Sequence, residues 1–292
     1  MKYRDRLGNE FEQTTGQDKF LADAYASSIG RGLMKFLGNP IFSKLSRVIL
    51  DSKISTIAID YFAKSNNIDL TEYEDKEFVS FNDFFIRKIK RGRRFVTKDD
   101  RVLVSPCDGK VSAYEITNYS SFIVKNSVYT VESLLRDKKL AERYNGGTAF
   151  IIRLAVDDYH RYIYPCNGIK SHNRFISGIL HTVNPIVSKY LPVFKENCRE
   201  YCLIRSDNFG DVIQMEVGAL MVGKITNAHK DICRVRRGDE KGYFEFGGST
   251  IILLLKKDKV KICEDLFDNT KKGFETIVKQ GEILKRLNIY RK

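Results

Sequence analysis

The chain contains the stretch Gly242-Tyr243-Phe244-Glu245-Phe246-Gly247-Gly248-Ser249-Thr250, which continues as Ile251-Ile252-Leu253-Leu254-Leu255. Two glycines, a hydroxyl residue and five aliphatic residues in this order predict a tight turn that enters a buried strand. Glycine also lets another group approach a backbone carbonyl closely. Ser249 could therefore attack the carbonyl of its own preceding peptide bond, at Gly248. Taken alone, the stretch favours the plain turn.

The composition is that of a soluble globular protein with a core, because the 292 residues are 42% hydrophobic and 30% charged. The length allows one large domain or two smaller ones. No apolar run approaches the roughly 18–20 residues that span a bilayer, and the first residues predict no secretory signal. We therefore expect reduced cytosolic thiols, since the six cysteines form no C-x-x-C pair: Cys107, Cys166, Cys198, Cys202, Cys233 and Cys263. A metal site of Cys198, Cys202 and one histidine is conceivable, but its spacing matches no standard template, so no metal is expected.

The formal net charge of +13 says something about partners and nothing about the fold. It is compatible with an anionic lipid surface, with nucleic acid and with plain solubility. Much of it is concentrated in a basic run at residues 87–94. This run is either a solvated helix end or a patch that contacts phosphate groups, and it consists of Arg87, Lys88, Lys90, Arg91, Arg93 and Arg94.

Residues 20–66 have apolar side chains at helical spacing, with breaks at 38–40 and 51–52. Basic residues outnumber acidic ones between the apolar positions. This pattern suits helices that lie in a membrane interface, and it suits equally well helices that pack on a core and expose a basic side. Ser80 is a predicted N-cap for a further helix that begins with Phe81.

The pattern changes near residue 101 to short β-rich segments with regular turn signals. Strands are predicted at 102–104, 110–114, 150–154, 212–217 and 251–255, and a helix is predicted at 271–291. There is no βαβ alternation and no internal repeat. The predicted fold class is α+β, with a helical, basic N-terminal part at 1–100 and a mainly antiparallel β body at 101–292.

Three residues are candidates for chemistry, although each has a common structural explanation. Asp108 lies in a Pro-x-Asp-Gly turn, where an aspartate usually bonds its own backbone. His160 and His181 are two of only four histidines, and a lone histidine is most often a structural residue. Residues 218–224 almost spell a phosphate-binding loop, but Ile225 cannot bind magnesium, so an NTPase is rejected.

Seven motifs in one order resemble the phosphatidylserine decarboxylases, and the length and double glycine are most similar to the clostridial type. Each motif is weak alone, but together they cover most of the chain. They are Phe81-Asn82-Asp83-Phe84-Phe85-Ile86-Arg87-Lys88, Ser105-Pro106-Cys107-Asp108-Gly109-Lys110, Asp158-Tyr159-His160-Arg161, Thr182-Val183-Asn184-Pro185, Phe194 with Asn197 and Arg199, Val217-Gly218-Ala219, and Lys241-Gly242-Tyr243-Phe244 through Gly247-Gly248-Ser249-Thr250.

The resemblance implies a proenzyme that makes phosphatidylethanolamine and carbon dioxide from phosphatidylserine, with a self-generated pyruvoyl cofactor. Ser249, activated by His160 that Asp108 orients, would attack the Gly248 carbonyl. Cleavage between Gly248 and Ser249 would leave chains 1–248 and 249–292, the second beginning with a pyruvoyl group made from Ser249. Its ketone would form a Schiff base with the substrate amine and act as an electron sink. His160 is the leading candidate to protonate the resulting carbanion.

Three positions depart from the family pattern. Ile163 stands where many members have a second histidine, Gly247 where many have leucine, and Lys224 where serine is frequent. Because one imidazole is missing, either His160 performs both proton transfers or His181 serves as an auxiliary residue.

The resemblance also implies a peripheral enzyme at the cytoplasmic face of the cell membrane, with its N-terminal helices on an anionic surface. The sequence leaves open whether the protein forms a homodimer, and no nucleic-acid partner is expected. The alternatives, in order, are a pyruvoyl-dependent decarboxylase of a soluble amino acid, a lipid-binding relative that never cuts itself, and a basic nucleic-acid-binding protein, for which the sequence has no recognised motif.

Overall fold

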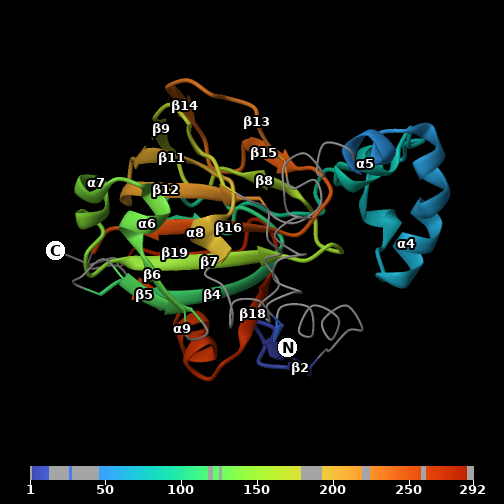
Figure 1. Ribbon diagram of the computed structural model, residues 1–292. Helices are drawn as coiled ribbons and strands as arrows, with labels where there is room; N and C mark the ends of the chain where they lie inside the picture. Colours follow the sequence, from blue (N-terminus) through green and yellow to red (C-terminus); the bar gives the residue numbers. More distant parts are fainter. Residues whose placement is uncertain are drawn as a thin grey trace.

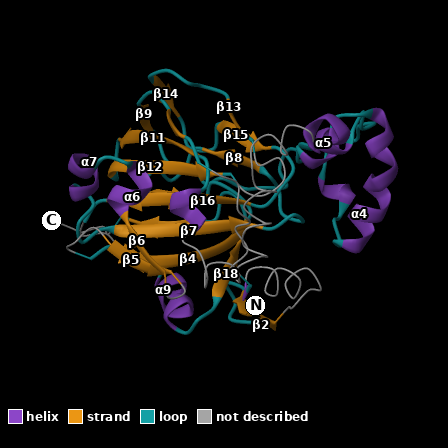
Figure 2. Ribbon diagram, in the orientation of Figure 1, coloured by secondary structure: helices purple, strands orange, loops and turns teal. Residues whose placement is uncertain are grey.

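The computed structural model describes residues 2–12, 26–27, 46–117, 121–124, 127–178, 193–218, 224–257 and 261–287. A β body makes up most of it, and helices α4 and α5 lie together at one side of this body (Figure 1). The strands of the body run roughly side by side, with short helices over them (Figure 2).

The body is organised around one large sheet of 11 strands. β1 and β18 pair in parallel, and every other strand pair in the described ranges is antiparallel, which confirms the predicted character of the body. β10 (Arg174–Ile176) pairs with β11, along the part of that strand that β9 does not cover. The order of the others is β14 (Cys233–Val235), β9 (Gly168–Lys170), β11 (Arg199–Ser206), β12 (Gly210–Val217), β16 (Ser249–Leu255), β7 (Thr148–Leu154), β4 (Gly109–Glu115), β18 (Glu275–Val278), β1 (Lys2–Arg4) and β2 (Glu10–Glu12).

Among the described residues, three smaller sheets and four short helices complete the body. The sheet nearest the candidate site is β13 (Ile225–Asn227), β15 (Glu240–Phe244) and β8 (Arg161–Ile163), in the order β13-β15-β8. The remaining elements are β3 (Val102–Val104), β5 (Ser121–Val124), β6 (Ser127–Thr130), β17 (Lys261–Ile262), β19 (Ile283–Arg286), α6 (Val131–Leu135), α7 (Lys138–Glu142), α8 (Val193–Glu196) and α9 (Glu264–Lys271).

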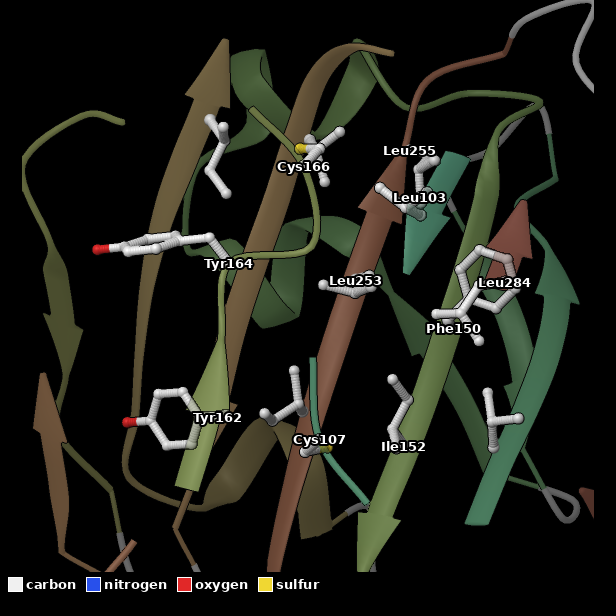
Figure 3. Close-up of a cluster of buried hydrophobic side chains, with 14 of the residues drawn as sticks. Leu103, Cys107, Phe150, Ile152, Tyr162, Tyr164, Cys166, Leu253, Leu255 and Leu284 are labelled. Carbon is white, nitrogen blue, oxygen red and sulfur yellow. The ribbon is translucent and has the colours of Figure 1, made fainter. Parts of the chain in front are cut away.

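The aliphatic run at 251–255 forms the buried strand β16, as predicted. A strand covered on both faces reads as a continuous apolar run because alternate side chains enter two different cores. Ile251, Leu253 and Leu255 enter one core, which also contains Tyr162 of β8 and Phe244 of β15. We call this core the Leu253 cluster, and Figure 3 shows part of it. Ile252 and Leu254 enter the opposite core, beneath α6 and α8.

The last strands of the chain are interleaved with earlier ones. β16 lies between β12 and β7, and β18 lies between β4 and β1. β19 lies between β17 and β3. β16, β18 and β19 are therefore each hydrogen-bonded to strands that precede Ser249.

In the described residues, the helical part at the side of the body comprises a helical turn at 46–50, η1 (Lys53–Ala58), α4 (Ile59–Ser65), η2 (Leu70–Glu72) and α5 (Phe81–Phe85). The predicted break at 51–52 and the predicted N-cap are confirmed, since Asp83 N donates to Ser80 Oγ at 3.1 Å. Ile59, Ala63, Phe81, Phe84 and Phe85 are buried together, which gives these short helices a small core of their own.

Two predictions about the fold are wrong. The helical N-terminal part does not include residues 2–12, because β1 and β2 extend the large sheet. The segment at 271–291 is not a helix in its described residues: Gly273 (φ +83°) follows the end of α9, and β18 and β19 come next. Thr276, Ile277 and Val278 are β-branched and favour that strand. Most of residues 13–45 lie outside the described residues, and the boundary at residue 100 stays a prediction.

Candidate functional site

The Gly-Gly-Ser segment crosses from the small sheet to the large one. β15 ends at Phe244 and β16 begins at Ser249, so residues 245–248, which we call the crossing segment, connect two sheets. Gly247 has φ +141°, a conformation that side-chain-bearing residues rarely adopt. This explains why Gly247 suits a position where leucine would be strained.

Hydrogen bonds from other elements hold the crossing segment and the residue before it. Phe244 N donates to His160 O at 3.0 Å and Glu245 N donates to Lys224 O at 3.0 Å. Phe246 N donates to Asn82 Oδ1 at 3.2 Å. The buried Glu245 carboxylate also lies within 3.0 Å of Arg47 Nε and 3.1 Å of Lys224 Nζ. The segment is therefore fixed in place by both the body and the helical part.

The aromatic motif at 81–85 supports the crossing segment through Phe246. The Phe246 ring lies 5.2 Å from Phe81 and 5.0 Å from Phe85, edge to face in both cases. Such pairs add roughly 0.5–1.5 kcal/mol beyond the area that they bury. Phe85 also lies 4.2 Å, ring to ring, from His160. One small helix thus contacts both the crossing segment and the candidate base.

Ser249 is the first residue of β16 and is fully buried. Its Oγ has no hydrogen-bond partner within the described ranges. Because Ser249 has the same parity as Ile251 and Leu253, its side chain points to the face of the Leu253 cluster, beneath the small sheet. A buried hydroxyl without a partner is costly, and in native proteins it calls for an explanation such as a catalytic role.

His160 reaches the same end of the sheet by a short turn. Leu154 is paired directly with Ser249, and the chain turns at 155–159 before β8 begins. His160 is fully buried, and its Nδ1 lies 2.9 Å from the Asp158 carbonyl oxygen. A carbonyl can only accept, so Nδ1 carries the proton in this contact. Nε2 is buried and has no partner in the part of the chain that the structure describes.

Burial lowers the pKa of His160 to about 4, although the nearby Asp158 carboxylate opposes this shift. The imidazole is therefore neutral at physiological pH, and the lone pair of Nε2 is free to accept a proton. Burial likewise disfavours the Asp158 carboxylate, but Lys110 Nζ at 2.7 Å more than compensates and lowers the pKa of Asp158. Asp158 is a site residue whose role sequence reasoning missed, although it lies within the quoted His160 motif.

Asp108 is buried, but its carboxylate is bonded to groups other than His160. Arg94 binds it through two nitrogens, Nε to Oδ1 at 2.9 Å and Nη2 to Oδ2 at 2.6 Å. Gln280 N donates to Oδ1 at 2.8 Å, and Lys279 Nζ lies 3.3 Å from Oδ2. The structure thus differs from the expectation that Asp108 orients His160, because the Asp158 backbone carbonyl makes that contact. The sequence placed Arg94 only in the basic run and did not predict its contact with Asp108.

The two remaining histidine questions have different outcomes. Ile163 packs with Val102 and Val104 in a separate apolar cluster, so no imidazole occupies that position and the surroundings are apolar. His181 lies outside the described residues.

The basic run at residues 87–94 is not uniformly exposed: Arg87 is buried, with its guanidinium carbon 4.3 Å from the centre of the Tyr73 ring, and Arg94 binds Asp108. These two cations are therefore not available to an external phosphate.

Comparisons with known proteins agree over nearly the whole chain. Residues 81–285 match the family described as phosphatidylserine decarboxylase. "Phosphatidylserine decarboxylase proenzyme 2" of Clostridium acetobutylicum is 46% identical over 280 residues, covering 96% of this chain and 94% of that protein. "Phosphatidylserine decarboxylase proenzyme" of Clostridium botulinum strain Langeland is 41% identical over 97% of this chain and 98% of its own. The protein of the same name from Clostridium perfringens strain SM101 is 40% identical, with 94% and 95% covered.

Proposed function

This chain belongs to the phosphatidylserine decarboxylase family, and on that premise we propose that it converts phosphatidylserine to phosphatidylethanolamine and carbon dioxide. The observation that carries the proposal is the buried Ser249 hydroxyl, without a partner in the described chain, directly after the two glycines. Relatives named as proenzymes imply that a precursor is processed, and this segment has the residues for it.

The processing step uses groups of the chain itself. His160 Nε2 accepts the Ser249 hydroxyl proton while Oγ attacks the Gly248 carbonyl carbon. The Gly248–Ser249 peptide bond breaks, and an ester to Ser249 Oγ replaces it. His160 passes the proton to the nitrogen of residue 249, which becomes a free amine. Loss of the Cα proton of residue 249 then breaks its Cβ–Oγ bond and releases Gly248 as a carboxylate. One water molecule replaces the nitrogen, which leaves as ammonia. The products are chain 1–248 and chain 249–292.

The surroundings of Ser249 fit the pyruvoyl group that this step would form. The hydroxyl oxygen has no hydrogen bond to lose within the described part of the chain, and Ile251 and Leu154 provide an apolar wall. A pyruvoyl ketone supplies an electron sink for the loss of carbon dioxide. Beside it, Nε2 of His160 would take up a proton released by the substrate ammonium group and pass it to the substrate carbon, and the surrounding buried rings would exclude water.

An intact-mass spectrum under denaturing conditions tests this function first. We expect two chains separated between Gly248 and Ser249, with the second lighter by one ammonia than simple hydrolysis would give. The purified protein should then release carbon dioxide from phosphatidylserine vesicles. A single mass for the uncut chain would favour the lipid-binding alternative. Cleavage with activity only on a free amino acid would favour the soluble-substrate alternative.

We further propose that the helical part docks peripherally on the anionic cytoplasmic face of the cell membrane. Ile54, Ile57 and Tyr61 follow helical spacing and are 78%, 81% and 79% exposed. The opposite side of the same segment buries Ile59 and Ala63, so these short helices are apolar on two sides. Lys53 and Lys64 are exposed nearby and would add attraction to anionic lipid. Within the described ranges, no helix has the length and apolar character to cross a membrane.

Replacing Ile54 and Ile57 with aspartate should weaken binding to vesicles of phosphatidylserine and phosphatidylcholine at least about tenfold, since burial of each side chain contributes on the order of 1.5–3 kcal/mol. Co-sedimentation measures this directly. Phe175→Asp is the matched control, because Phe175 is 60% exposed on β10, a strand that pairs with β11 of the large sheet and does not belong to the helical part. Equal binding by the double variant and the control would contradict docking through this face.

A further inference from the structure

A buried ion pair connects the small sheet to the large one. Lys241 Nζ lies 2.6 Å from Glu216 Oε2, and the two side chains are 1% and 0% exposed. Asn227 binds both partners, since its Oδ1 accepts from Lys241 Nζ at 3.0 Å and its Nδ2 donates to Glu216 Oε2 at 3.4 Å. Burial disfavours the Lys241 ammonium, but Glu216 raises the pKa of Lys241 above its ordinary value. We call this contact the Glu216–Lys241 pair.

A bulge in β15 aims Lys241 at the large sheet. The register between β15 and β8 shifts between Glu240 and Gly242, which makes Lys241 the extra residue. Bulges re-aim side chains in this way and are frequent beside active sites. Gly242 allows the close packing that follows, because a Cβ there would lie 2.1 Å from Thr226 O. β13, which carries Asn227, can therefore lie against β15.

The Glu216–Lys241 pair connects the two ends of the crossing segment. Lys241 lies on β15, which leads into residues 245–248, and Glu216 is paired with Ile251 on β16, which those residues enter. Directly paired residues share a face, and every second residue along a strand shares it too. Glu216 and Ser249 therefore lie on one face, a single diagonal step apart. Glu216 Oε1 and Ser249 Oγ are both buried without partners within the described ranges.

We propose that the Glu216–Lys241 pair is a positioning pair for self-cleavage, which fixes β15 relative to β16 and so holds the Gly248 carbonyl within reach of Ser249 Oγ. This inference rests on the proposed function. The pair acts through the backbone of two strands and exchanges no proton with the reacting atoms. Correct alignment of a nucleophile is worth a great deal, and a displacement of about 1 Å can cost about 100-fold in rate.

The experiment follows cleavage of freshly synthesised chains in a cell-free translation reaction, quenched at intervals and resolved on denaturing gels. Glu216→Gln should slow cleavage at least about tenfold. Because this change leaves the Lys241 charge buried and uncompensated, it also destabilises the fold. The double variant Glu216→Gln with Lys241→Met removes both charges. It should recover the wild-type unfolding midpoint while cleavage stays at least about tenfold slow.

Asp211→Asn is the matched control. Asp211 is on the same strand as Glu216, near its other end, and accepts a hydrogen bond from Lys256 Nζ at 2.7 Å. The rate of self-cleavage of Asp211→Asn should be within about twofold of the wild-type rate. Cleavage of the double variant at the wild-type rate would overturn the inference, and so would a delay that disappears at a temperature where each variant is fully folded. An uncut wild-type chain would instead count against the proposed function itself.

Discussion

A protein in which Ser249 is replaced by alanine should remain a single uncut chain and form no carbon dioxide from phosphatidylserine. Ser249 supplies the attacking oxygen, and its Oγ has no structural hydrogen bond within the described residues to lose. The substitution removes one buried oxygen from a site with apolar neighbours, so the fold should be retained. Intact mass measures the cleavage, and thermal unfolding of the uncut chain checks the fold.

Thr250→Val is the matched control for Ser249→Ala. Thr250 is the next residue of β16, it is fully buried, and its hydroxyl is also unpartnered in the described chain. Its side chain points to the other face of the sheet, so this variant should cut normally. Cleavage of Ser249→Ala between the same two residues would show that another group is the nucleophile. Loss of cleavage in Thr250→Val alone would assign that role to Thr250.

Replacement of His160 with glutamine should slow self-cleavage by roughly 10²–10⁴-fold, the usual contribution of a general base. Glutamine keeps a hydrogen-bonding side chain near the Asp158 carbonyl, but it cannot accept the Ser249 proton at neutral pH. The rate should be measured from pH 3.5 to 8. With the wild-type pKa of His160 lowered to about 4, wild-type cleavage should be flat above about pH 5 and fall as the pH drops through 4.

His160 should also change how the free energy of unfolding depends on pH in acid, which a simple packing residue would not do. A lowered pKa in the folded state means that the unfolded chain binds the proton more readily. His160 therefore lowers the free energy of unfolding as the pH falls from about 6.5 towards 4, and the glutamine variant should lack this part of the decline. If His160→Gln cuts itself at the wild-type rate and its stability depends on pH as in the wild type, His160 is not the general base. His181 would then be the first residue to replace.

Local sequence patterns predicted the β body well because the physics of those segments is local. The aliphatic run at 251–255 could be buried only on two faces, and it forms the central strand β16. The prediction of a C-terminal helix failed because α9 ends at Lys271, before Gly273, and the β-branched residues beyond it pair with β4. The N-terminal strand β1 was also missed. Three residues carry little periodicity, and β1 exists because β18 offers it a free edge.

The candidate site was predictable in its residues but not in its contacts. Ser249 and His160 approach the same end of the sheet because Leu154 is paired with Ser249, a long-range register that no local pattern contains. The partner of Asp108 is Arg94, which shares no motif with it and belongs to a basic run that the sequence assigned either to a solvated helix end or to a phosphate-contacting patch. The Glu216–Lys241 pair also depends on tertiary structure, because only the bulge in β15 turns Lys241 inward.

The interleaving of β16, β18 and β19 with earlier strands has a consequence for the order of events in the life of this protein. An uncut chain folds as one molecule, and its late strands find their places by an intramolecular search. Once the chain is cut, the same assembly becomes an association of two molecules, and its recovery after unfolding depends on concentration. Folding must therefore come before cutting. The mature protein is then preserved by the height of its unfolding barrier, and a batch that has once been melted at low concentration should not regain its structure.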